Sequence, residues 1–133
     1  MTDDKKQIDL LARTIYGEAR GEGVEGMQAV ANVIMNRVNA GKWYGRTVSE
    51  VVLKPYAFSC WNENDANYNI IRNINDNNGY FGVAKTLATA AYNGNLQDIT
   101  KGATHYHAAG ITPYWAGSMQ KTVIIGNHVF YRE

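Results

Sequence analysis

The chain has 133 residues, of which 45% are hydrophobic and 19% are charged, so it fits one folded domain over residues 1–133 and not a disordered chain. Thirteen Lys and Arg residues oppose twelve Asp and Glu residues, and the net charge of +1 excludes both a polycation that binds nucleic acid and an acidic tail. Its apolar runs are far shorter than the roughly 20 residues of a transmembrane helix, so we expect no membrane insertion.

The first half of the chain has the periodicity of amphipathic α-helices. An apolar face repeats over residues 8–15, and three glycines in residues 17–23 predict that this helix ends or bends there. A second apolar face over residues 27–38 precedes Gly41, which fits a C-terminal helix cap. Residues 47–50 have the form of a capping box and predict a short helix. The apolar positions of the two long helices are Ile8, Leu11, Ala12 and Ile15, then Met27, Val30, Ala31, Ile34 and Val38.

The middle of the chain is rich in asparagine. Residues 62–78 contain eight asparagines, which predicts a long polar excursion with one short helix near residues 68–74. A further helix is expected to follow and to end near Gly94. Its apolar face consists of Phe81, Ala84, Ala88 and Ala91.

The end of the chain is β-prone. Residues 122–125 and 128–131 are separated by Gly126-Asn127, which is a strong signal for a β-hairpin. Residues 104–107 are expected to add a third short strand. The predicted fold class is therefore α+β, with a helical body and a small antiparallel element near the C-terminus.

Glu18 is the first candidate for chemistry because it extends the apolar face of the first helix three residues beyond Ile15. A carboxyl group there is partly desolvated, which favours the protonated form that a general acid needs. The alternative is an exposed glutamate at a frayed helix end. Glu22 and Glu25 lie at the start of the second helix, where acidic side chains suit the positive end of the helix dipole, so we expect structural roles for them.

The other carboxylates bear on the kind of glycosidase chemistry. Hydrolysis of a glycoside with water usually takes two carboxylates, about 5–5.5 Å or 6.5–9.5 Å apart. Glu50 belongs to the capping box, Asp76 lies in the asparagine-rich segment, and no second carboxylate stands out. The sequence therefore favours a reaction that needs one acid/base group.

Residues 58–62 (Phe-Ser-Cys-Trp-Asn) form an aromatic-flanked polar stretch that we expect in a loop. The indole of Trp61 can stack on a pyranose face, and the Asn62 amide can read its hydroxyl groups. Cys60 is either a nucleophile paired with His105 or His107 or a small buried hydrophobic residue.

His105, His107 and His128 raise the question of a metal site. Residues 105 and 107 point to one face of a strand, so with a third ligand they suit zinc. A catalytic zinc would need all three histidines or an added carboxylate, and His128 flanks a turn where a polar residue needs no special explanation. We therefore expect no metal and no cofactor, with His105 or Tyr106 lining a cleft.

The blocks around these candidates resemble a known family. Residues 11–22 (LARTIYGEARGE) and 26–38 (GMQAVANVIMNRV) resemble the catalytic domain of the spore cortex-lytic cell wall hydrolases, which phage endolysins share. The resemblance continues at residues 58–62, 102–107 and 125–131, and so covers nearly the whole chain. It implies a lysozyme-like α+β fold that acts on peptidoglycan, by lytic transglycosylation in the best-understood members.

The family's catalytic glutamate, the first of its E-A-R-G-E block, falls on Glu18. The resemblance implies that Glu18 protonates the oxygen between N-acetylmuramic acid and N-acetylglucosamine. As a carboxylate it then takes the proton of the muramoyl C6 hydroxyl, and a 1,6-anhydro ring closes without water. The residues expected to bind the glycan strand are Ser59, Trp61, Asn62, His105, Tyr106 and Trp115.

The sequence departs from the spore enzymes at its start, where the residues are charged and lack the apolar core of a Sec signal peptide. We also expect no peptidoglycan-binding repeat before the domain. We therefore expect a monomeric phage or prophage lysin, made in the cytoplasm and acting on the wall after the membrane is breached. Two alternatives stay open. One is an amidase or peptidase that uses Cys60 with His105, or a zinc ion held by the histidines. The other is a non-catalytic glycan-binding module.

Overall fold

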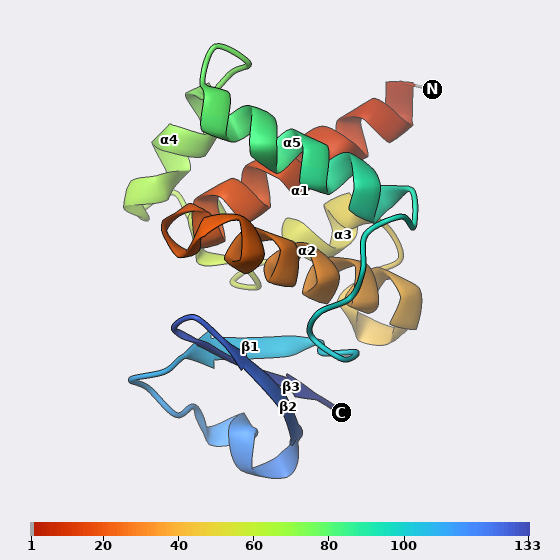
Figure 1. Cartoon of the computed structure of the whole chain (residues 1–133), viewed down its shortest axis with the longest axis vertical. Helices are drawn as coiled ribbons and strands as arrows, with labels where there is room; N and C mark the ends of the chain where they lie inside the picture. Colours follow the sequence, from red (N-terminus) through yellow and green to blue (C-terminus); the bar gives the residue numbers. More distant parts are fainter. Residues whose placement is uncertain (1) are drawn as a thin grey trace.

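Five α-helices form one body, and a small antiparallel sheet lies beside it (Figure 1). The computed structural model describes residues 2–133. The helices are α1 (Thr2–Ala19), α2 (Gly23–Ala40), α3 (Val48–Val52), α4 (Ala66–Asn73) and α5 (Gly79–Tyr92), with the 3-10 helices η1 (Arg20–Glu22), η2 (Lys42–Tyr44), η3 (Ser59–Trp61) and η4 (Tyr114–Ser118) between elements. The strands are β1 (His105–Ala108), β2 (Gln120–Ile125) and β3 (His128–Arg132). This order confirms the predicted α+β class.

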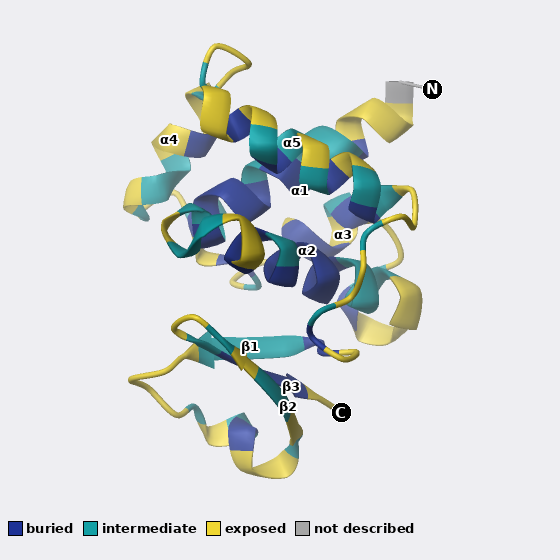
Figure 2. Cartoon of the chain, viewed as in Figure 1, coloured by how far each residue is buried: buried dark blue, intermediate teal, exposed yellow. Residues whose placement is uncertain are grey.

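Helix α1 runs through the helical body and contacts the other four helices. Its predicted apolar face is buried, since Leu11, Ala12 and Ile15 have no exposed surface and Ile8 is partly buried against them. The apolar face of α2 packs on the same core, and Figure 2 shows the buried residues of both helices in the interior. Each fully buried Leu or Ile contributes roughly 1.5–3 kcal/mol to folding. None of the helices in residues 2–133 is long and apolar enough to cross a lipid bilayer.

The glycines predicted to end the first two helices do so. α1 stops at Ala19, and after η1 the chain turns into α2 through Gly23, whose φ is 78°. α2 ends before Gly41, whose φ of 68° lets its N–H donate to the carbonyls of Arg37 and Val38 at 3.0 and 3.2 Å. Both positions lie in the left-handed region that favours glycine.

The predicted capping box at α3 forms only in half. Thr47 Oγ1 accepts a hydrogen bond from the backbone N–H of Glu50 at 3.1 Å, as expected. The carboxylate of Glu50 reaches one residue further back and accepts from the N–H of Arg46 at 2.8 Å.

The asparagine-rich segment contains one helix, as predicted, although α4 begins two residues earlier than residue 68. Asp65 starts α4 by accepting a hydrogen bond from the N–H of Asn67, and Asn78 starts α5 by accepting from the N–H groups of Tyr80 and Phe81. All four predicted apolar residues of α5 are buried against α1 and α2.

The sheet has the order β1-β3-β2, with every neighbouring pair antiparallel. The predicted hairpin joins β2 to β3 at Gly126-Asn127, and the predicted third strand pairs with β3 so that Tyr106 lies opposite Phe130. These two side chains pack toward Ala29 and Val33 of α2. Because side chains alternate along a strand, His105 and His107 point to the opposite face. The sheet thus presents Tyr106 to the helical body.

Candidate active site

Glu18 lies in the last turn of α1, between η3 and strand β1. Its Oε1 accepts a hydrogen bond from the hydroxyl of Tyr106 at 2.7 Å. Its Oε2 accepts one from the backbone N–H of Cys60 at 3.2 Å and a longer one from the Ser59 hydroxyl at 3.5 Å. Both carboxylate oxygens are therefore held by groups from two other parts of the chain, while the residue itself remains partly exposed.

A close approach of η3 to α1 makes this arrangement possible. A Cβ atom at Gly17 would lie 2.9 Å from both Cys60 Cβ and Ile71 Cγ2, so only glycine fits beside η3 at this position. Trp61 adds a second tie, because its Nε1–H donates to Thr14 Oγ1 at 2.9 Å, one turn before Glu18 on the same helix. The predicted sugar-binding residues Ser59 and Trp61 thus lie on the Glu18 side of the molecule.

Tyr106 packs against two aromatic rings of strand β3. Its ring centroid lies 5.5 Å from that of Phe130 and 5.1 Å from that of His128. Burial and the nearby charge of Glu18 raise the pKa of Tyr106 well above its ordinary range, so the hydroxyl stays protonated and donates to Glu18. The structure therefore makes Tyr106 a direct partner of the candidate acid, in addition to the glycan contact predicted for it.

Arg37 of α2 is a partly buried charge near the site, and the sequence did not single it out. Its Nε–H donates to the Thr104 carbonyl at 2.7 Å, and its guanidinium lies 5.4 Å from the ring centroid of Tyr44 and 5.3 Å from that of Phe58. Burial lowers the pKa of Arg37, while the nearby Tyr106, Tyr44, Glu133 and Glu18 act in the other direction. Position 37 continues the apolar spacing of residues 30 and 34, so Arg37, like Glu18, is a charged residue that extends the apolar face of a helix.

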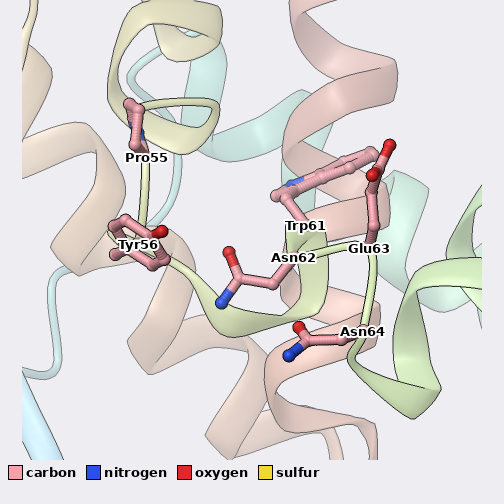
Figure 3. Close-up of a pocket in the computed structure, with 6 residues that line it drawn as sticks. All are labelled: Pro55, Tyr56, Trp61, Asn62, Glu63 and Asn64. Atoms are coloured by element: carbon pink, nitrogen blue, oxygen red, sulfur yellow. The ribbon is translucent and has the colours of Figure 1, made fainter.

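Two cavities lie along this side of the molecule. One, of about 260 Å³, is lined by Gly17, Glu18, Arg20, Gly21 and Asn67. The other, of about 490 Å³, is lined by Pro55, Tyr56, Trp61, Asn62, Glu63 and Asn64. Figure 3 shows Tyr56 and Asn62 facing each other across this cavity, with Trp61 against α1. Tyr56 is 88% exposed and has a φ of 65°, a left-handed conformation that non-glycine residues seldom adopt and that is common at binding sites.

His105 and Trp115 lie elsewhere. Their rings pack on each other at 5.1 Å, and His105 also packs on Tyr44 at 5.9 Å. Both belong to an aromatic group with His107 and Tyr131, on the face of the sheet opposite Tyr106. None of their contacts in the described chain joins them to Glu18, and their predicted role in glycan binding stays a prediction.

The alternative catalytic groups do not come together. His128 packs on Tyr106, on one face of the sheet, whereas His105 and His107 lie on the other, so the three histidines do not converge. Within residues 2–133 no three His, Cys, Asp or Glu side chains gather as a metal site would require. Cys60 is fully buried, and burial and the charge of Glu18 raise the pKa of its thiol far from the range of a nucleophile.

Glu22 has a structural role, but it binds the hairpin turn, whereas the sequence predicted a role at the start of α2. Its side chain makes no cap on α2. Instead its carboxylate accepts hydrogen bonds from the backbone N–H of Asn127 at 2.8 Å and from the Asn127 side-chain amide at 3.4 Å. The hydrogen bond from the Asn127 backbone lowers the pKa of Glu22. Glu22 thus fastens the hairpin turn to the helical body.

The chain is similar to a known protein family and to several of its members. A family model described as Cell Wall Hydrolase matches residues 21–131. The chain is 34% identical over 125 residues to the spore cortex-lytic enzyme of Halalkalibacterium halodurans. The aligned region covers 92% of this chain and 34% of that protein. The chain therefore spans about a third of the length of this curated relative.

Two solved structures are also similar. The catalytic domain of the Bacillus cereus SleB protein has a TM-score of 0.76 and 31% identity, over 96% of this chain and 91% of that one. The catalytic domain of the germination-specific lytic transglycosylase SleB from Bacillus anthracis has a TM-score of 0.74 and 33% identity, over 95% and 93%. Both likenesses agree with the helical body and small sheet described above.

Proposed function

The chain belongs to the cell wall hydrolase family, and from this premise we propose that it degrades peptidoglycan, with Glu18 as the acid and base of a lytic transglycosylase. Glu18 lies just outside residues 21–131, the part that the family model matches. The support for its role is therefore the geometry around its carboxylate. The observation that carries the proposal is the Glu18 carboxylate, which is partly exposed and held at Oε1 by Tyr106 and at Oε2 by Cys60.

The chemistry follows from one carboxyl group used twice. Protonated Glu18 gives its proton to the glycosidic oxygen between N-acetylmuramic acid and N-acetylglucosamine, and the bond from that oxygen to the muramoyl C1 breaks. The resulting carboxylate accepts the proton of the muramoyl C6 hydroxyl as O6 bonds to C1, which closes the 1,6-anhydro ring and restores the acid. Asp65, a carboxylate near Cys60, is already engaged as the cap of α4, which supports a reaction with a single acid/base.

The glycan strand has a surface beside this carboxylate. The cavity of about 490 Å³ offers the ring of Trp61, the amide groups of Asn62 and Asn64, and the exposed ring of Tyr56. Aromatic faces and amides are the groups that bind sugar rings and hydroxyls. Trp61 is tied to Thr14, one helical turn from Glu18, so sugar units bound in this cavity lie close to the acid.

The experiment is digestion of purified peptidoglycan followed by mass spectrometry. Anhydromuropeptides are the expected product, whereas reducing ends would indicate hydrolysis by water, free stem peptides an amidase, and unchanged strands a binding module. Glu18→Gln should lower the rate by about 10²–10⁴-fold or more, since general acid–base catalysis has this size and one residue serves twice. Glu25→Gln, an exposed glutamate on α2, is the control and should retain activity.

The setting of the reaction is a separate matter. The relatives named above are spore and germination enzymes, and the phage or prophage lysin setting stays a prediction. It can be tested by producing the protein inside a bacterial host with and without a pore-forming protein in the membrane. Lysis that needs the pore supports the prediction, and lysis without it contradicts it.

A further inference from the structure

The cavity of about 260 Å³ beside Glu18 contains a fixed positive charge. Arg20 lines it together with Gly17, Gly21 and Asn67. Arg20 Nη1 donates to the carbonyl of Tyr16 at 3.2 Å, and Nη2 donates to Asn67 Oδ1 at 2.7 Å. The guanidinium also lies 5.1 Å from the ring centroid of Tyr16. These contacts hold the cation in one place before any ligand binds.

This charge has no acidic partner in the described chain. The ion pairs within residues 2–133 are Arg13 with Asp9 and Lys85 with Asp76, so no carboxylate lies within 4.0 Å of Arg20. A guanidinium has five N–H donors, and the contacts of Arg20 use only those on Nη1 and one on Nη2. The Nε–H and one Nη2–H remain as donors for a ligand, and a guanidinium binds carboxylates well.

The cavity also has room for such a group. A Cβ atom built on Gly21, which lines the same cavity, would have no heavy atom within 4 Å outside its chain neighbours, so the cavity is open at this position. Glu18 lines the same cavity, so a ligand group bound at Arg20 is carried by the sugar unit that lies next to Glu18. On the proposed function that sugar is muramic acid, whose O3 carries a lactyl group that ends in a carboxylate or continues into a stem peptide with carboxylates of its own.

We propose that Arg20 binds a carboxylate carried by the O3 substituent of the muramic acid whose C1–O bond Glu18 cleaves. This inference rests on the proposed function for its substrate. It adds a specificity residue: Arg20 would fix which sugar of the strand lies over the acid, because N-acetylglucosamine has no such substituent.

The test is a binding measurement that needs no cleavage. In the Glu18→Gln background, calorimetry measures the Kd of glycan strands with intact stem peptides and of strands stripped to the lactyl carboxylate. Each is compared with a copy whose carboxylates are capped as methylamides. The charged strands should bind about tenfold to hundredfold more tightly than the capped copies, and Arg20→Gln should abolish that difference. If the stripped strands show the difference in Kd, the lactyl group supplies the carboxylate. If only the strands with stem peptides show it, the stem peptide supplies the carboxylate.

Asn67→Ala is the matched variant, since it removes the contact with Nη2 but keeps the charge, and it should preserve most of the difference. Equal binding of charged and capped strands overturns the proposal, as does a difference that persists in Arg20→Gln. If Arg20→Gln does not fold, equal binding of charged and capped strands in the Glu18→Gln background with Arg20 intact still overturns the proposal. Failure of the proposed function shows itself separately, as a digest without anhydro ends.

Discussion

Tyr106→Phe is the sharpest perturbation of the proposed active site. It removes one oxygen atom and the hydrogen bond of 2.7 Å to Glu18 Oε1, and it keeps the ring that packs against His128 and Phe130. A hydrogen bond to a charged group contributes about 1.5–3 kcal/mol, so kcat should fall roughly ten- to 150-fold if this bond orients the carboxyl group in the transition state. KM should change little, because the hydroxyl faces Glu18.

The assay is the initial rate of anhydromuropeptide release over a range of peptidoglycan concentrations, together with the thermal unfolding midpoint. Tyr131→Phe is the matched control. It removes a hydroxyl that is hydrogen-bonded to His107 Nε2 at 2.9 Å, on the opposite face of the sheet, and should leave kcat unchanged. Full kcat in Tyr106→Phe would refute the reasoning. A raised KM with unchanged kcat would show that Tyr106 acts as the glycan contact that the sequence predicts.

Three further outcomes are expected. Glu22→Gln should lower the stability at neutral pH by less than about 1 kcal/mol, because the hydrogen bonds to Asn127 are partly exposed. The hydrogen bond from Asn127 lowers the pKa of Glu22, so this stabilisation is present above the ordinary value of 4.5 and is lost as the pH falls through the lowered pKa. Chemical denaturation from pH 7 to pH 3 should show the difference in unfolding free energy between the wild type and Glu22→Gln closing. A difference that widens on acidification contradicts the assignment. Cys60→Ser should keep lytic activity within about tenfold, and so should treatment with EDTA; a larger loss of rate in a folded protein would favour the amidase or peptidase alternative. Gly17→Ala should cost about 1–3 kcal/mol in a denaturation curve, because its methyl group would overlap Cys60 and Ile71, and an unchanged midpoint would mean that η3 moves freely.

Most of the fold could be predicted because its signals are local. The apolar spacing of Ile8, Leu11, Ala12 and Ile15 defines one face of a helix without reference to any partner, and that face is the one α1 buries. The signals at Gly41 and at the Gly126-Asn127 turn are equally local, because the positive φ at Gly41 and Gly126 favours glycine. Glu18 could be found by the same means, as a carboxyl group that continues an apolar face.

The site could be predicted only in part because its contacts span the chain. The hydrogen bond from Tyr106 to Glu18 joins residues 88 positions apart, and it depends on which face of β1 meets the helical body. The same register separates His128 from His105 and His107, which no spacing rule reveals. Arg37 is different, since its place on the apolar spacing of α2 was a usable signal.

The distance along the chain between the two halves of the site has a consequence for synthesis. Translation delivers Glu18 early, within the first helix, but the groups that hold Oε1 and fasten the hairpin turn, Tyr106 and Asn127, emerge much later. A growing chain on the ribosome therefore carries a glutamate whose site is incomplete until residues 104–132 have been made and docked. A fragment that ends before residue 104 would share this condition, so neither unfinished chains nor such proteolytic fragments should have the proposed activity.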